Sequence, residues 1–255
     1  MKNKCLSKHN KFYRFSKIYE NTNLDDYKNK IITIFVTEGK IEIEINKKIV
    51  EVHADQGILI SSKSNISSIN LIDNAILYEV VSEKKTENLI EFVDNGTELN
   101  EEEIIYYKIL DNHKKVEKPW GYELWIIWLK DYHVLKKIFM KKNFKCSLQF
   151  HREKYETNYI LSGKARIINN FHVGPKAGID ETQKKIENID LLKDYSKEIN
   201  APYSFSVMPG EVHRIYSIED YISYEVSTPQ LDDVIRIQDD YKRKSGRIVS
   251  EHKNK

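Results

Sequence analysis

Cysteine, glycine and proline are all scarce in this chain, which holds two cysteines, nine glycines and five prolines in 255 residues. Cys5 and Cys146 lie far apart in the sequence and fit neither a disulfide framework nor a zinc motif. A single bridge between the two stays open, but reduced thiols are what we expect of a cytoplasmic protein.

Long apolar runs are absent as well. The longest clean one, IITIFV at 31–36, is far too short to cross a bilayer, and the basic N-terminus has no apolar segment behind it, unlike a secretory signal. The net charge of +2 leaves opposite charges nearly balanced, so there is no electrostatic reason to expect nucleic acid or a membrane surface as a partner. We therefore expect a cytoplasmic protein.

Strand patterns, by contrast, are abundant. Four successive segments between residues 31 and 61, and another at 75–82, alternate and are rich in β-branched residues. A charged, partly helical stretch follows, and strands are expected again at 123–129, 132–140, 146–150, 157–161, 165–168, 204–208, 213–217 and 222–227. Many short strands separated by turn residues predict an all-β sandwich or barrel, and the length allows two modest domains.

A weak internal repeat supports two domains of one kind. TEGKIEI at 37–43 matches LSGKARI at 161–167, and ADQGILIS at 54–61 corresponds to VMPGEVHRI at 207–215. The chain therefore predicts two copies of one β-unit.

Residues 181–199 interrupt the strands with the spacing of an amphipathic helix. Its apolar stripe would hold Ile186, Ile189, Leu192 and Tyr195. We interpret this insertion, which spans about 172–200, as a cap on one end of a barrel; a moving lid is the alternative.

The segment SLQFHREKYETNYILSG at 147–163 places an amide, an imidazole and a carboxylate within eight residues. Gln149 and His151 are two residues apart, so on a strand both side chains point to the same face. The polar REKY stretch can bend the chain and return Glu156 to the same place. His213 opens another strand directly after the Pro-Gly turn of MPGEVH.

These four side chains form a mixed nitrogen and oxygen set that suits one divalent ion. The alternative is a group of unrelated surface residues. The order Gln-x-His, Glu, glycine turn and Pro-Gly-x-x-His favours the metal, because it is the cupin pattern. Zinc is the ion we expect, although manganese, iron, cobalt and nickel accept the same ligands.

Residues 118–243 resemble the cupin-type (type II) mannose-6-phosphate isomerase family. The resemblance is carried by KPWGYE, SLQFHREKYETNYILSGKARI, MPGEVHRI and EVSTPQLDDVIRIQDDYKR, in the family's order, over roughly the C-terminal half. It implies the same four residues as metal ligands. The chain departs from the family where HRE replaces a run of histidines, where Lys242 replaces a glycine, and in the helical insertion; these departures concern the substrate more than the metal.

The resemblance also implies two catalytic residues. Lys136 stands in a lysine position of the family, where a lysine beside a cation would transfer a proton or hold an oxyanion; it could instead face solvent. Arg236 is also kept, where a guanidinium could clamp a phosphate or protonate an enediolate oxygen. The alternative for Arg236 is an ion pair with Asp232, Asp233 or Asp239.

Four further residues are candidates for binding a phosphorylated sugar. Trp120 and Tyr122 of KPWGYE could form a stacking wall, although such residues often only plug a barrel end. Lys118 and Arg214 could contact the phosphate.

The N-terminal half has no glycine-rich nucleotidyltransferase signature, so it is not the usual fusion partner of this family. Counting back from Gly39, and forward from Gly57, places Asp25, Tyr27, Ile32 and Ile60 where the C-terminal copy has its ligands. One possible ligand in four makes no site. We expect a metal-free cupin that packs against the other barrel or mediates a homodimer.

Together these observations predict an all-β protein of two cupin (jelly-roll) domains: a degenerate cupin at 1–90, a helical linker at 91–114 and a metal-binding cupin at 115–255. The expected function is a metal-dependent aldose–ketose isomerase of the mannose-6-phosphate/fructose-6-phosphate type, in the synthesis of sugar-nucleotide or surface-polysaccharide precursors. The alternatives are an Fe(II) dioxygenase and a non-catalytic bicupin that binds a sugar or nucleotide sugar.

Overall fold

The computed structural model describes residues 7–19, 24–82, 98–99 and 106–251. The chain forms two compact units, and each is described by itself. The first unit holds the described residues within 1–87, 94–113 and 126–134, and the second holds those within 114–125 and 135–255. The linker expected at 91–114 lies partly outside the described residues.

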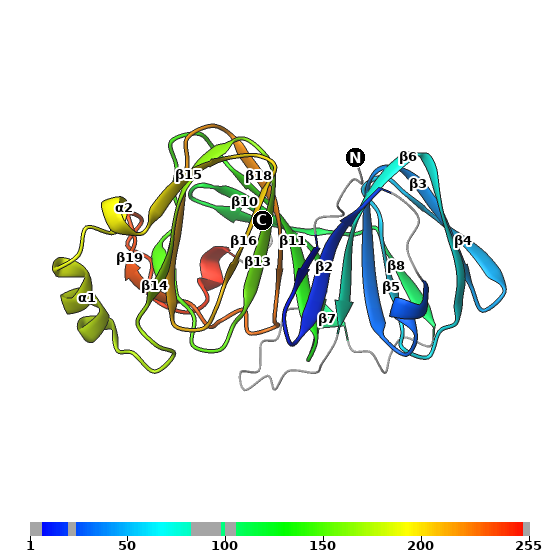
Figure 1. The fold of residues 1–255 in the computed structure, drawn as a ribbon, viewed down its shortest axis with the longest axis horizontal. Helices are drawn as coiled ribbons and strands as arrows, with labels where there is room; N and C mark the ends of the chain where they lie inside the picture. Colours follow the sequence, from blue (N-terminus) through cyan, green and yellow to red (C-terminus); the bar gives the residue numbers. More distant parts are fainter. Residues whose placement is uncertain (1–6, 20–23, 83–97, 100–105, 252–255) are drawn as a thin grey trace. The chain divides into compact units, whose positions relative to one another are not determined.

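The first unit is built on a seven-stranded antiparallel sheet in the order β1-β2-β6-β3-β5-β8, with β4 paired to β3 (Figure 1). Its two longest strands, β3 and β6, pair along most of their length, where the sequence indicated shorter strands. The elements are β1 (Ser7–His9), β2 (Tyr13–Ile18), η1 (Leu24–Tyr27), β3 (Ile31–Ile45), β4 (Lys48–His53), β5 (Gly57–Ile60), β6 (Ile66–Ser82), β7 (Glu98–Leu99) and β8 (Tyr107–Leu110).

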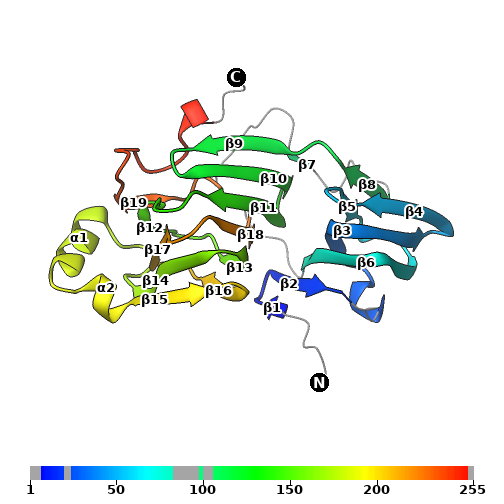
Figure 2. The same cartoon turned by 90° about the horizontal axis from the view of Figure 1, so that it is seen from above.

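The remaining strands form two further sheets, in the orders β16-β13-β18-β11-β10-β7, with β9 paired to β10, and β15-β14-β17-β12-β19 (Figure 2). The elements are β9 (Lys114–Lys118), β10 (Gly121–Leu129), β11 (His133–Met140), β12 (Leu148–Phe150), β13 (Glu156–Ser162), β14 (Lys164–His172), α1 (Ile179–Glu187), α2 (Leu191–Asp194), β15 (Ser196–Asn200), β16 (Tyr203–Val207), β17 (Glu211–Ser217), β18 (Tyr221–Ser227), β19 (Ile235–Gln238) and η3 (Val249–Glu251).

The two glycines of the predicted repeat do the same work in the two units. Gly39 (φ +68°) and Gly163 (φ +90°) both have left-handed backbones. A Cβ on Gly39 would lie 2.6 Å from the carbonyl oxygen of Ile72, and one on Gly163 would lie 2.1 Å from that of Asp220. Only glycine fits such a close approach of two backbones, so the repeat reflects a shared architecture.

The insertion differs from the single helix predicted over 181–199. Helix α1 ends at Glu187, and the side chain of Asn188 donates to the carbonyl of Lys184. Asp190 then caps the short helix α2 by accepting the backbone N–H of Lys193 at 3.1 Å. From Ser196 the chain becomes strand β15, which pairs with β14.

The apolar stripe of the insertion is also partly different from the prediction. Leu192 is 58% exposed, and Leu191 is buried in its place; Ile186, Ile189 and Tyr195 pack on the core as expected. The helices lie on Leu148 and Phe150, which alternate with Gln149 along β12 and so form the outer face of the sheet. The insertion therefore covers a flank of the barrel and not its end (Figure 2).

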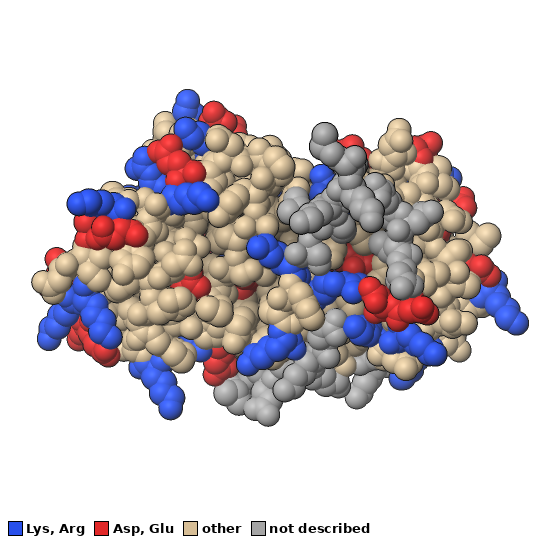
Figure 3. Space-filling view, viewed as in Figure 1, with Lys and Arg blue, Asp and Glu red and all other residues tan. Residues whose placement is uncertain are grey.

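Three smaller features complete the description. No helix in the described ranges is long and apolar enough to cross a membrane. Cys146 is a free thiol whose sulfur accepts the N–H of Ile215 at 3.2 Å; Cys5 lies outside the described residues. Lys, Arg, Asp and Glu side chains are interspersed on the face of the helical insertion shown in Figure 3.

Candidate metal centre and charged cavity

Neighbouring strands of the second unit bring the predicted ligands together. Gln149 of β12 pairs directly with His213 of β17, so their side chains share the inner face of the sheet. Leu148 and Phe150, their alternating neighbours, are buried in the core on the outer face. The alternation of β12 thus separates packing residues from site residues.

The loop between β12 and β13 is held by one buried carboxylate. The side chain of Asp233 accepts the backbone N–H groups of Arg152, Glu153 and Lys154 at 3.0, 2.6 and 3.0 Å. The backbone carbonyl of Asp233 also accepts a hydrogen bond from Nδ1 of His151. These contacts fix the bend that the polar REKY stretch predicted.

His151, Glu156 and His213 converge as a buried cluster whose candidate ligand atoms all lie within 4.8 Å of one another. Nε2 of His151 is 3.1 Å from Oε1 of Glu156, and Nε2 of His213 is 3.7 Å from Oε2. Two ligands bonded to one ion at about 2.1 Å lie about 3.0–3.4 Å apart, so the spacing is close to that of a metal site.

The hydrogen bonds of both rings also fit a metal. Nδ1 of each histidine faces a backbone carbonyl, that of Asp233 for His151 and that of Glu211, at 3.1 Å, for His213. An Nδ1–H that donates to a carbonyl leaves Nε2 as a lone pair, the form that binds a metal. Nε2 of His151 is buried without a hydrogen-bond partner in the described structure. The residues present therefore fit a divalent cation.

Gln149 lies at the cluster but turns its amide nitrogen towards it. Nε2 of Gln149 is 3.3 Å from Nε2 of His213, while Oε1 accepts the hydroxyl of Ser147 at 2.6 Å. Rotation of the amide by 180° would direct the oxygen inwards. In the arrangement described, the ligand set is two imidazoles and one carboxylate.

The cluster is strongly polarised. Burial alone would raise the pKa of Glu156, but Lys154 and the two histidines hold it well below its usual value. Burial lowers the pKa of His213 to about 4, against the opposing effect of Glu156. Glu156 is thus a carboxylate and His213 a neutral imidazole near neutral pH, and both are the ligand forms.

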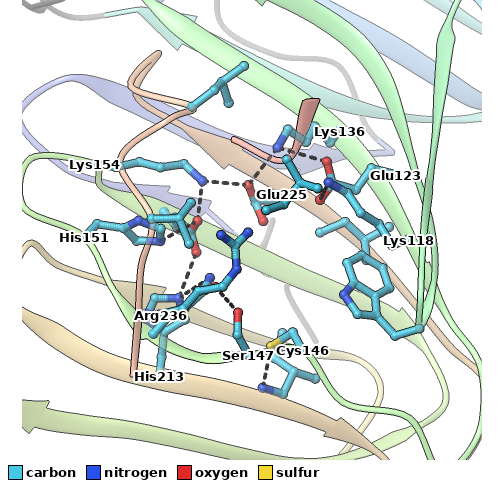
Figure 4. Close-up of a pocket in the computed structure, with 18 of the residues that line it drawn as sticks. Lys118, Glu123, Lys136, Cys146, Ser147, His151, Lys154, His213, Glu225 and Arg236 are labelled. Atoms are coloured by element: carbon cyan, nitrogen blue, oxygen red, sulfur yellow. Dashed lines mark hydrogen bonds and ion pairs between the residues drawn. The ribbon is translucent and has the colours of Figure 1, made fainter. Parts of the chain in front are cut away.

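Lys154 begins a ladder of alternating charges that leads away from the cluster (Figure 4). Its ammonium donates to Glu156 and lies 3.3 Å from Glu225. Lys136 then lies 3.8 Å from Glu225 and 3.3 Å from Glu123. The ladder carries cations of both β11 and the β12–β13 loop into one interior.

The ladder continues to the C-terminal part of the chain. Lys118 lies 3.6 Å from Glu123 and 2.8 Å from Glu251, which in turn is 3.2 Å from Arg243. Burial would raise the pKa of Glu123, but Lys118 and Lys136 outweigh it and hold the pKa far below its usual value. Every charge of the ladder therefore has a partner of opposite sign.

A cavity of about 120 Å³ opens onto this ladder. Among the residues singled out from the sequence, it is lined by Lys118, Trp120, Lys136, Gln149, His151, Glu156, His213 and Arg236. Nη1 of Arg236 donates to the carbonyls of Lys244 and Gly246, so this guanidinium also holds the C-terminal segment.

Tyr122 and Arg214 lie elsewhere. Tyr122 stacks on Phe139 at 5.3 Å between ring centroids, and Arg214 donates to the carbonyl of Gln238 at 3.0 Å. Each alternates along its strand with a residue that lines the cavity, Glu123 in one case and His213 in the other, and so belongs to the opposite face.

Sequence reasoning missed the rest of the ladder. Glu225 carried a signal, because a glutamate within the apolar strand 221–227 needs a buried partner. Lys154 carried one too, since it is two residues before Glu156. Arg243 and Glu251 gave no local signal of a site.

Solved structures share this fold at low sequence identity, although no family model and no curated protein matches the chain. Oxalate decarboxylase from Lactobacillus farciminis, in a formate complex, is 11% identical, with a TM-score of 0.55 over 91% of this chain and 86% of that one. Oxalate decarboxylase from Bacillus subtilis, studied for its Mn(II) centres, is 10% identical, with a TM-score of 0.55 over 91% and 77%.

A putative glyoxylate-induced protein from Pseudomonas aeruginosa is 9% identical, with a TM-score of 0.53 over 85% of this chain and 73% of that one. At these identities the likeness shows the fold alone. The chain is an all-β protein with the two-domain cupin fold, and its second unit carries a His-Glu-His cluster able to hold a divalent metal.

Proposed function

We propose that the chain is a metal-dependent sugar-phosphate isomerase that interconverts an aldose and a ketose. The observation that supports this most is the joining of the His151–Glu156–His213 cluster to a cavity lined by lysines, arginines and carboxylates. Mannose-6-phosphate and fructose-6-phosphate are the first pair to test, because of the family that the C-terminal half resembles.

A divalent ion held by these ligands would polarise the sugar carbonyl. The remaining work falls to the chain itself. Lys136 is 6% exposed and its ammonium lies against two carboxylates and 5.1 Å from the centre of the Trp125 ring. We assign to Lys136 a hydrogen bond to the oxygen on which negative charge develops.

The substrate contacts follow from what lines the cavity. Trp120 is 5% exposed and offers a ring face, and Lys118 offers a cation. Arg236 faces the same cavity with a buried Nε that has no partner within the described residues, so it remains our candidate for an oxygen of the substrate. Tyr122 and Arg214, on the outer face, would act only through the strands that they support.

A second candidate is an Fe(II) enzyme that activates O₂. The ligand set described, two histidines and one glutamate, is the composition of the facial triad of non-haem iron oxygenases. The charged ladder favours the isomerase, because a ring of lysines beside the metal suits a phosphorylated substrate.

The test is a panel of hexose, pentose and heptose phosphates, incubated with metal-loaded protein in D₂O and followed by NMR, with O₂ consumption recorded in parallel. The proposal expects aldose–ketose conversion with deuterium entering at C2. His213→Ala should abolish it, whereas His172→Ala, at an exposed histidine of β14, should not. O₂ uptake without sugar conversion would instead establish the second candidate.

A further inference from the structure

The C-terminal 3₁₀ turn η3 brings a carboxylate to two cations at the cavity. Glu251 lies 2.8 Å from Nζ of Lys118 and 3.2 Å from Nη1 of Arg243. The three side chains are 9–11% exposed. A carboxylate thus fills a position where two nearly buried cations converge.

Arg243 is prepared for this position by other contacts. Asp239 accepts from Nε and Nη2 of Arg243 at 3.0 and 2.8 Å, which leaves Nη1 directed at Glu251. A guanidinium fixed in this way presents a donor to an anion at little entropic cost. Lys118 belongs to β9, so the second cation is also held by the barrel.

The turn that carries Glu251 is weakly anchored. Helix η3 buries none of its three residues, and Val249 is 58% exposed. Upstream, the segment is tied by Gly246, whose N–H donates to the carbonyl of Val234 at 2.8 Å. Few apolar contacts hold the turn itself, so its displacement costs little free energy.

The charges around the cavity also point to an anion. Among the described residues, six cationic and five anionic side chains line it: Lys118, Lys136, Lys154, Arg236, Arg243 and Arg247 against Glu123, Glu156, Glu225, Asp232 and Glu251. Four of these carboxylates lie in the barrel strands or next to β19. Glu251 alone comes from the terminal turn, so it is the one that can leave without unfolding the barrel.

We propose that Lys118 and Arg243 form an anion-binding subsite and that Glu251 is its internal occupant, displaced when ligand binds. The ligand class is a phosphate monoester, an identification that rests on the proposed function. The ammonium and the guanidinium supply the charge-assisted donors that a phosphate requires. Glu251 then sets the affinity of the site, because every bound phosphate must compete with it.

The probe is inorganic phosphate, titrated calorimetrically into metal-loaded protein. Glu251→Gln should raise the phosphate affinity about tenfold, the effect of removing one competing charge-assisted contact. In the Glu251→Gln background, Lys118→Met should cancel this gain. Glu198→Gln is the matched control, since Glu198 also bridges two cations, Arg166 and Lys164, but on the exposed surface.

Equal phosphate affinity in the wild type and Glu251→Gln would overturn the subsite. So would a gain that survives Lys118→Met, because phosphate would then bind elsewhere. Thermal melting of each variant checks that it folds. The titration needs no turnover: an affinity gain without any sugar conversion would retain the anion subsite and reject the isomerase, and the reverse result would do the opposite.

Discussion

The two barrels of this chain spend the same interior position differently. In the first unit, Ile32 of β3 pairs with Ile60 of β5 inside an apolar core. The repeat aligns these isoleucines with Glu156 and His213 of the second unit, where the interior holds paired charges. One architecture therefore supports either a packed core or a reactive cavity, depending on a few inward-facing side chains.

The comparison shows what a site costs. Buried ion pairs contribute little net stability, because desolvation cancels most of their attraction, but removing one partner is expensive. The first barrel gains from burial of apolar surface in proportion to area. We therefore expect the first unit to contribute stability and the second to contribute chemistry.

The most severe way to break the comparison is to give the first barrel a site residue. Ile32→Glu would bury a carboxylate among isoleucines with no cation near it. We expect a loss of more than about 4 kcal/mol in the free energy of unfolding, measured by urea denaturation. Ile49→Glu, at a position 71% exposed, should change it by less than about 0.5 kcal/mol. Similar effects at both positions would refute the packed interior.

The converse change removes a charge from the second barrel. Glu156→Gln leaves Lys154 with Glu225 as its carboxylate partner, so the metal-free protein should lose about 3 kcal/mol. Affinity for a divalent ion should fall at least about 100-fold by isothermal titration, because the only charged ligand is gone. Glu153→Gln, at an exposed residue of the same loop, should leave both quantities unchanged.

The shared glycines sharpen the likeness of the two barrels. Gly39→Ala and Gly163→Ala should each cost about 3 kcal/mol, because the new Cβ would strike a backbone carbonyl. Gly174 also has a left-handed backbone, at φ +91°, but nothing lies within 4 Å of its Cβ position. Gly174→Ala should therefore cost only about 1 kcal/mol in the same urea experiment. Equal costs at all three would mean that the close approaches play no part.

The smallest effect concerns one buried histidine of the first unit. His133 lies between the hydroxyls of Thr33, at 2.8 Å, and Ser82, at 2.7 Å, and burial lowers its pKa to about 3. The unfolded chain binds a proton below about pH 6.5, whereas the folded protein does not until about pH 3, so stability falls as the pH drops through this interval.

The expected loss from this histidine is about 2 kcal/mol between pH 7 and pH 5, measured by urea denaturation. His133→Gln should remove that part of the pH dependence, and His53→Gln, at an exposed histidine, should keep it. An unchanged pH profile in His133→Gln would show that the imidazole is not held neutral.

The strands and the metal cluster could be predicted because their signals are local. Alternation marks β12 and β13, a glycine marks the turn at Gly163, and the spacing of His151 and Glu156 needs only one bend. The second unit's ligands therefore came from short-range rules, together with the resemblance that placed His213.

What could not be predicted depends on contacts between distant residues. Glu225 and Lys154 are 71 residues apart, and Glu251 meets Lys118 across 133 residues. The predicted helix over 181–199 failed for a related reason: the pairing of Ser196–Asn200 with β14 outweighs the helical spacing of its side chains.

The metal content of the purified protein, measured by mass spectrometry, tests the central claim most directly. The account predicts one divalent ion per chain in the wild type and none in a His151→Ala/His213→Ala variant that still folds. An ion retained by that variant, or two ions per chain in the wild type, would contradict the assignment of a single metal centre to the second barrel.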